Sequence, residues 1–199
     1  MSSFVLPRAA VICLISLVPA CGGPPPAESP SGPEVTGIEQ YFPLGDGYVY
    51  TYETVDNAKG NQDMLLLRVR RPDPRHAQLQ TGSGVRLLQI TSEAIRREGS
   101  GFVLRAPLRE GATWDGDNGG STRVEAVGVA VSVPAGDFKD CIRTVEEIGG
   151  AGRGRITSVY CKGVGIAEMN VEQWEGADHA TKRFQLRSYG PPVNLDAEP

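Results

Sequence analysis

The sequence contains few of the residues on which hydrolytic and metal-dependent sites are usually built. Its two histidines, His76 and His179, both lie in stretches typical of exposed loops. No G-x-S-x-G or S-x-x-K pattern occurs, so the serine arrangements of common nucleophilic hydrolases are missing. Two histidines also supply a zinc site poorly. We therefore predict that the protein is not an enzyme and has no catalytic residue, no metal site and no cofactor.

Three further absences narrow the fold and the partners. Apolar residues show no sustained 3.6-residue period, which argues against a helical bundle. The 20 basic and 24 acidic residues give a net charge of −4 without long basic runs, so we expect no binding to nucleic acid. The apolar run from Ala9 to Val18, broken only by Ser16, is too short to cross a bilayer as a helix.

Residues 1–20 have the features of a secretion signal, because Arg8 precedes the apolar run and small residues follow it. The V-P-A-C sequence at 18–21 resembles the lipobox of bacterial lipoproteins. This resemblance implies that Cys21 carries acyl chains such as palmitate and that this anchor attaches the protein to a membrane of the bacterial cell envelope. Gly22 is not the aspartate that favours inner-membrane retention in such lipoproteins, so we expect the outer membrane, facing the periplasm.

The rest of the chain divides into three parts. Removal of the signal leaves 199 − 20 = 179 residues, enough for one domain with a substantial core. Residues 21–37 hold the lipidated cysteine and a proline-rich tether that buries little apolar surface. We expect a single β-rich domain over 38–190 and a disordered tail over 191–199.

Residues 38–190 contain many short segments typical of β-strands. Valines between 127 and 133 alternate with small residues. Residues 94–98 and 102–106 are predicted to form a hairpin around a G-S-G turn, which we favour over a short helix across 91–98. About ten such strands separated by turn residues predict an all-β fold, an antiparallel curved sheet or half-barrel built of hairpins.

The stretch 133–165 predicts a central hairpin with one cysteine in each strand. A glycine-rich loop supplies positions that can adopt positive φ. If Glu147 pairs with Arg155, the same register places Cys141 opposite Cys161. Once Cys13 leaves with the signal and the anchor cysteine is acylated, these two remain. Export to an oxidising compartment favours a disulfide over two separately buried thiols.

A short motif, P-L-x-x-G-x-x-aromatic, occurs at 43–50 and again at 107–114, a spacing of 107 − 43 = 64 residues. Two related β-meanders or chance would both explain it. Together with V-P-A-G-D-F at 133–138 and Tyr160 followed by G-V-G, the motif resembles a loose group of uncharacterised bacterial lipoproteins and secreted β-proteins that share a "VPAGTF" hairpin and "YxxGVG". The resemblance implies a curved sheet similar to the LolA and LolB lipoprotein carriers, and no catalytic residue.

Two acidic patterns have weaker links to chemistry. The D-G-D-N-G-G sequence at 115–120 resembles the start of a calcium loop, but Ala126 stands where the bidentate glutamate is needed. We therefore predict a flexible β-turn. The adjacent pair Glu146 and Glu147 is predicted to lie on a solvated strand face, as are Glu168 and Glu172.

Aromatic residues are the candidates nearest to a function. They are predicted to form either sheet core or the ligand-binding wall of an apolar groove, and they are Tyr48, Tyr50, Tyr52, Trp114 and Trp174. Two hypotheses follow. The protein is a non-catalytic envelope lipoprotein that holds a hydrophobic small molecule or acyl chain in its curved sheet. Alternatively, it is a structural or assembly lipoprotein that docks a partner envelope protein.

Overall fold

The computed structural model describes residues 37–57, 60–150, 153–176 and 178–191. Every described residue belongs to the unit Gly32–Pro199. The predicted signal, Cys21, nearly all of the tether and the tail beyond Pro191 lie outside the described residues. Within the described ranges, no helix is long and apolar enough to cross a membrane.

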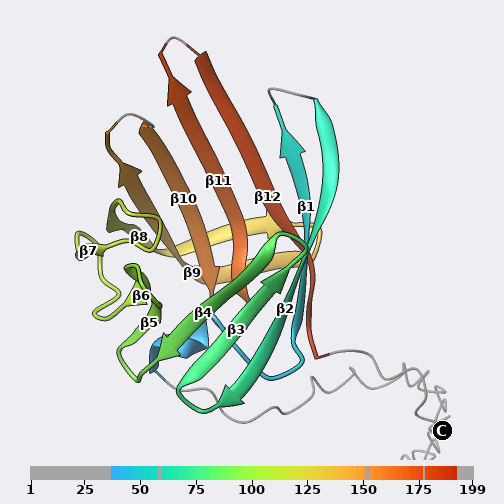
Figure 1. Ribbon diagram of the computed structural model, residues 1–199, viewed down its shortest axis with the longest axis vertical. Helices are drawn as coiled ribbons and strands as arrows, with labels where there is room; N and C mark the ends of the chain where they lie inside the picture. Colours follow the sequence, from blue (N-terminus) through green and yellow to red (C-terminus); the bar gives the residue numbers. More distant parts are fainter. Residues whose placement is uncertain (1–36, 58–59, 151–152, 177, 192–199) are drawn as a thin grey trace, which may run out of the picture. The chain divides into compact units, whose positions relative to one another are not determined.

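The described chain folds into one sheet of twelve antiparallel strands, which confirms the predicted all-β class (Figure 1). A 3₁₀ helix, η1 (Gly37–Tyr41), precedes the strands. The strands are β1 (Val49–Asp56), β2 (Asn61–Asp73), β3 (His76–Thr81), β4 (Gly84–Ile90), β5 (Ala94–Arg97), β6 (Phe102–Arg105), β7 (Thr113–Asp115), β8 (Ser121–Val133), β9 (Gly136–Ile148), β10 (Arg153–Cys161), β11 (Gly165–Glu175) and β12 (Asp178–Gly190). The hairpin predicted over 94–106 is present as β5 and β6.

The strand order divides the sheet into two six-stranded meanders. Strands β1 to β6 follow one another on one side, β7 to β12 on the other, and the meanders join where β1 pairs with β12. The sheet curls until its two edge strands approach each other, and a single bridge between Phe102 and Gly116 nearly closes it into a barrel. The curled sheet therefore encloses an interior.

Two glycines make this near-closure possible. A Cβ on Gly101 would collide with the carbonyl oxygen of Gly116, and a Cβ on Gly116 would collide with the Glu146 carboxylate. Trp114 lies at the same place and donates a hydrogen bond from Nε1 to the Phe102 carbonyl oxygen at 3.1 Å. Trp114 is buried here. We call this junction between β6 and β7 the seam.

The repeated P-L-x-x-G-x-x-aromatic motif is a structural repeat. Gly47 has φ 77° and its amide donates to Val69, whose amide donates back to Tyr48. Gly111 has φ 79° and makes the same exchange with Val124 and Ala112. Each motif is thus a tight turn that leads the chain into the first strand of a meander. The shared hydrogen bonding favours two related meanders over chance.

The central hairpin has the predicted register. Arg155 pairs with Glu147, and the β9–β10 ladder ends at the pair Tyr160 and Ile142. Cys141 and Cys161 occupy the next position and form a disulfide with Cα atoms 4.2 Å apart. Strand β9 begins earlier than the cysteine, at Gly136, because V-P-A-G forms the turn from β8.

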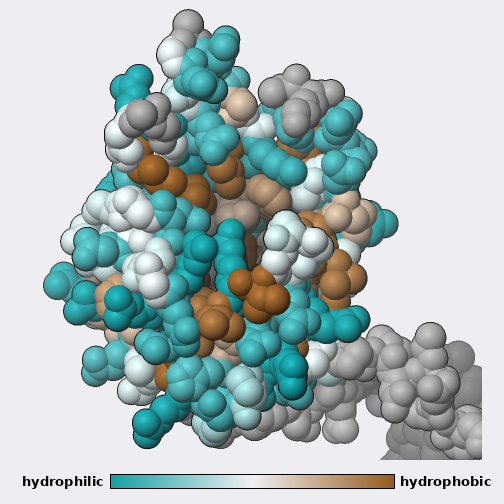
Figure 2. All heavy atoms as spheres, in the orientation of Figure 1, coloured by the Kyte–Doolittle hydropathy of each residue, from teal (hydrophilic) through white to brown (hydrophobic). Residues whose placement is uncertain are grey.

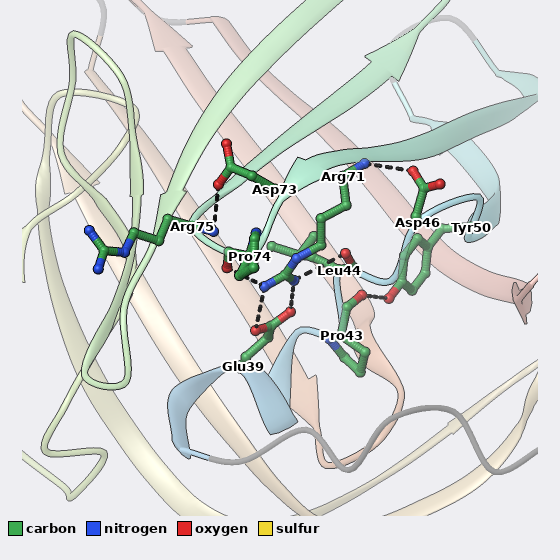
Figure 3. Close-up of polar contacts among 9 residues, drawn as sticks. All are labelled: Glu39, Pro43, Leu44, Asp46, Tyr50, Arg71, Asp73, Pro74 and Arg75. Atoms are coloured by element: carbon green, nitrogen blue, oxygen red, sulfur yellow. Dashed lines mark hydrogen bonds and ion pairs between the residues drawn. The ribbon is translucent and has the colours of Figure 1, made fainter.

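Helix η1 and the residues after it close one end of the interior. Phe42 is buried against the rings of Tyr50 and Tyr160, at centroid distances of 6.0 and 6.3 Å. Figure 3 shows how Arg71 of β2 holds this segment: its guanidinium pairs with Glu39 and donates to the carbonyl oxygen of Leu44 at 3.2 Å. The Arg71 side chain is only 19% exposed, so the pair is more than a solvated surface contact.

Candidate functional site

The curled sheet encloses a cavity of about 570 Å³, within the range of small-molecule sites. Phe42 lines it and belongs to the segment around η1 that Arg71 holds in place. Ser83, in the β3–β4 turn, and Gln173 on β11 line the cavity and are themselves exposed, so the cavity opens beside them. The space-filling view shows the molecule hollowed near its centre, with apolar and polar side chains at the rim (Figure 2).

Most of the cavity wall is apolar, as the strand alternation requires. On β2, Leu65 and Leu67 face the cavity, whereas Met64 and Leu66 point outward and are 55% and 50% exposed. Both meanders contribute to the wall. Its apolar side chains are Phe42, Tyr52, Leu65, Leu67, Leu79, Leu88, Val103, Ile148, Ile156, Tyr160, Ile166, Met169, Val171 and Phe184.

The second meander also contributes a polar end to the cavity. Glu146 lies on β9 between its partners Thr122 of β8 and Ile156 of β10. Thr144 and Ser158 form the neighbouring pair. The side chains of Thr122, Thr144, Glu146 and Ser158 line the cavity although each residue is at most 5% exposed. No described residue forms a hydrogen bond with the hydroxyl of Thr122 or Thr144, which leaves these two groups available to a ligand.

The Glu146 carboxylate holds the turn between β7 and β8. Its Oε1 accepts hydrogen bonds from the amides of Asn118 and Gly120, at 3.0 and 2.9 Å, and its Oε2 accepts one from Asn118 Nδ2 at 2.9 Å. The solvated position predicted for Glu146 is therefore wrong. It is right for Glu147, which is exposed and bonds Arg155 at 2.8 Å. The calcium-like sequence forms the predicted turn, organised by Glu146.

Asp117, in the same turn, is the second carboxylate at the polar end. Burial, and then the nearby Glu146 charge, raise the pKa of the Asp117 carboxyl to about 6, while Arg86 and Arg97 oppose this rise. Asn118 Nδ2 donates to Asp117 Oδ1 at 3.0 Å. The guanidinium of Arg86 lies 3.9 Å from Asp117 Oδ2, beyond hydrogen-bond distance. The polar end thus carries acceptors, hydroxyls and one flanking guanidinium.

Of the five aromatic residues predicted to bind a ligand, Tyr52 alone lines the cavity in the described structure. Its hydroxyl donates to the Ile166 carbonyl oxygen at 3.0 Å. Tyr50 is buried at the closed end and donates to Pro43, and Trp114 is part of the seam. Tyr48 packs its ring over Gly45. These three therefore have structural positions.

Trp174 and the histidines do not line the cavity, although His179 Nε2 lies 3.3 Å from the carboxylate of the cavity-lining Glu172. The indole of Trp174 stacks on His179 across β11 and β12, with ring centroids 5.0 Å apart. His179 is therefore exposed as predicted but lies on a strand, not in a loop. His76 begins β3 and bonds Asp73 through Nδ1 at 2.9 Å. The described residues contain no group of three histidine, cysteine or acidic side chains that could hold a metal ion.

The polar end of the cavity was not predicted from the sequence, because its residues form no recognisable sequence motif. A signal for it does exist on β9, where Ile142, Thr144, Glu146 and Ile148 share one face of the strand. Isoleucines at both ends of this face place the two polar residues between them on the same buried side. The charge of Glu146 predicted a solvent-exposed position. The alternation of side chains along β9 predicts the buried position that the structure shows.

No protein family model matches the sequence, and no curated protein is significantly similar to it. A candidate exported protein from Bacteroides fragilis, with a crystal structure of YmcC-like fold, has a TM-score of 0.50 and 14% identity, covering 75% of this chain and 98% of that chain. A candidate lipoprotein from Parabacteroides distasonis has a TM-score of 0.45 and 14% identity, with the same coverage of 75% and 98%. At this identity, the first likeness shows the fold alone. Similarity to the LolA and LolB carriers stays a prediction.

Proposed function

We propose that the protein is a lipid-anchored, non-catalytic component of the bacterial cell envelope that binds a hydrophobic small molecule or acyl chain inside its curled sheet. The observation that carries this proposal is the cavity of about 570 Å³ with a largely apolar wall. Apolar side chains lining an open cavity are costly in water, and an apolar ligand removes that cost. The B. fragilis neighbour, a candidate exported protein, is consistent with a place in the envelope.

The ligand is tested by matched substitutions on the two faces of β2. Leu67→Gln places an amide in the cavity wall, whereas Leu66→Gln changes the exposed neighbour. The full chain and both variants are purified in the same detergent, extracted with organic solvent and compared by mass spectrometry. We expect a stoichiometric apolar compound with the parent and with Leu66→Gln, and its loss from Leu67→Gln. Absence of any such compound, or equal amounts in both variants, contradicts ligand binding in the cavity.

The anchor is tested at Cys21, which the V-P-A-C sequence marks for acylation. In bacteria that process lipoproteins, we expect the mature chain to begin at Cys21, to carry acyl mass and to fractionate with the outer membrane. Cys21→Ala is expected to give an uncleaved or unanchored form. Normal processing and membrane attachment of Cys21→Ala would show that the lipoprotein hypothesis is wrong.

A second candidate function, docking of a partner envelope protein, is favoured by the outer face of the first meander. Strand β2 pairs with β3 only from Arg68 onward, so residues 61–67 have no described strand on that side. Met64 and Leu66 on β2 and Val85 and Leu87 on β4 are exposed. Under this proposal, Leu66→Gln combined with Leu87→Gln should abolish a cross-linked complex in cells, while Leu67→Gln should leave the complex intact.

A further inference from the structure

The polar end of the cavity differs from what an acyl chain alone requires. Thr122 and Thr144 are each 4% exposed, line the cavity and have no hydrogen-bond partner among the described residues. The described residues contain no buried polar side-chain atom without a hydrogen-bond partner, so both hydroxyls open onto the cavity, where solvent reaches them. A bound head group that displaces this solvent must replace its hydrogen bonds to the two hydroxyls.

The charges at this end favour one kind of head group. Glu146 and Asp117 both line the cavity, and their carboxylates are close enough for the Glu146 charge to affect the ionisation of Asp117. Arg86 faces Asp117 from β4, and Arg97 donates to the Asp117 carbonyl oxygen at 3.3 Å. The Arg86 side chain is 56% exposed, so water screens its charge more than those of the carboxylates. An anionic head group would meet two partly buried negative charges there.

Acceptor capacity also remains unused at this position. Asp117 Oδ1 accepts from Asn118, but no described residue donates a hydrogen bond to Asp117 Oδ2, whose nearest guanidinium nitrogen lies at 3.9 Å. A carboxylate oxygen accepts readily from a hydroxyl, and such a charge-assisted bond is stronger than a neutral one. Threonine hydroxyls can both donate to and accept from the same head group.

We propose that this end of the cavity selects apolar ligands with an uncharged, hydroxyl-bearing head group, such as the glycerol of a monoacylglycerol, over ligands with an anionic head group, such as a fatty acid. The inference rests on the proposed binding of an apolar ligand in the cavity. Asp117 accepts a hydrogen bond from the head group, the threonine hydroxyls bond it from β8 and β9, and the acyl chain lies along the leucines of β2.

The test uses the full chain in phosphatidylcholine vesicles and two photoactivatable probes with the same dodecanoyl chain, one an analogue of monolaurin and one of laurate. Cross-linked peptides are mapped by mass spectrometry. We expect the monolaurin analogue to label the cavity residues of β2 and β11 at least about tenfold more than the laurate analogue, after correction for partitioning into vesicles.

The variants distinguish the proposed head-group preference from the proposed binding of an apolar ligand in the cavity. Asp117→Asn should reduce the preference by about tenfold, and Thr144→Val, which keeps the side-chain shape, should weaken labelling by the monolaurin analogue. Thr113→Val, at an exposed position on β7, is the control. Because parent and variants are compared in vesicles of one composition, each probe partitions equally in all of these samples. Equal labelling by both probes, or a preference unchanged in both variants, overturns the head-group inference. If neither probe labels the cavity, the proposed ligand binding itself fails.

Discussion

The two meanders have the same number of strands but differ in what they bring to the interior. The first, β1 to β6, supplies the leucines of the apolar wall, with Arg86 as its one charged lining residue among those described. The second, β7 to β12, supplies Asp117, Glu146 and the buried hydroxyls, and it contains the disulfide. The comparison teaches that two meanders with similar backbones can line one cavity differently. One supplies apolar side chains, and the other supplies polar side chains that can form hydrogen bonds.

The two contacts between the meanders also differ from each other. A substitution at the seam is expected to have the largest effect on the free energy of unfolding. Strand β1 pairs with β12 along its whole length, whereas β6 and β7 meet through one bridge. Gly101→Ala places a Cβ against the carbonyl oxygens of Gly116 and Asp115 across the seam, so we expect the free energy of unfolding to fall by about 4 kcal/mol, measured by urea denaturation. Gly82→Ala, with nothing within 4 Å of the added Cβ, should change it by less than about 0.5 kcal/mol. Equal effects would show that the seam is not tightly packed.

The disulfide is a difference between the meanders that can be removed. Cys141→Ser combined with Cys161→Ser opens a link with a sequence separation of 20 residues. Loss of the link is expected to lower the free energy of unfolding by about 3 kcal/mol in the chain-entropy model. Denaturation of parent and variant with and without a reductant checks this, since a reductant should destabilise only the parent. Parent protein with two free thiols under oxidising conditions would contradict the bond.

Glu146 and Glu147 are neighbours on β9, but Glu146 faces the interior of the sheet and Glu147 faces solvent. Substitution of each residue therefore compares a buried with an exposed carboxylate. Glu146→Gln puts an amide where three donors now meet a carboxylate, so we expect a loss of about 2 kcal/mol in unfolding free energy. Glu147→Gln breaks only an exposed pair with Arg155 and should cost less than about 1 kcal/mol. Chemical denaturation of both variants measures the difference. Similar losses would mean that the turn does not depend on Glu146.

The smallest expected effect is the pH dependence that Asp117 adds to the second meander. Its pKa is raised from 3.8 to about 6, chiefly by burial, so the folded state binds a proton that the unfolded state has released. The stabilisation is complete below pH 3.8 and is lost as the pH rises through about 6. We expect this carboxyl to lower the free energy of unfolding by about 1 kcal/mol between pH 5 and pH 7.

Denaturation of the parent and of Asp117→Asn at both pH values isolates this contribution from the other carboxyls. The variant should lack the corresponding part of the pH dependence, and Asp115→Asn, at an exposed position before the same turn, should retain it. An identical pH dependence in the parent and Asp117→Asn would show that the Asp117 carboxyl has an ordinary pKa in the folded protein.

The sequence predicted the parts of the fold that depend on local pattern. Glycine-rich turns and alternation located the hairpins, and one assumed pair, Glu147 with Arg155, was enough to place Cys141 against Cys161. The position of Glu146 could not be predicted from its charge, because its three donors come from a turn more than twenty-five residues earlier. The sequence left Tyr50 and Trp114 open between sheet core and groove wall for a similar reason, since only the curled sheet decides which aromatics face the cavity and which fill its ends.

The pairing of β1 with β12 also determines where this domain could be cut and rejoined. Val49, the first residue of the first strand, lies opposite Gly190, the last residue of the last strand. A linker from Gly190 to Gly37 would keep η1 and the buried Phe42, and new termini opened at the exposed residues Arg109 and Glu110 would exchange the order of the meanders along the chain. Every ladder and the disulfide would stay within continuous segments of such a circular permutant. Each meander could therefore be transplanted, or replaced by a copy of the other, as one contiguous piece of gene.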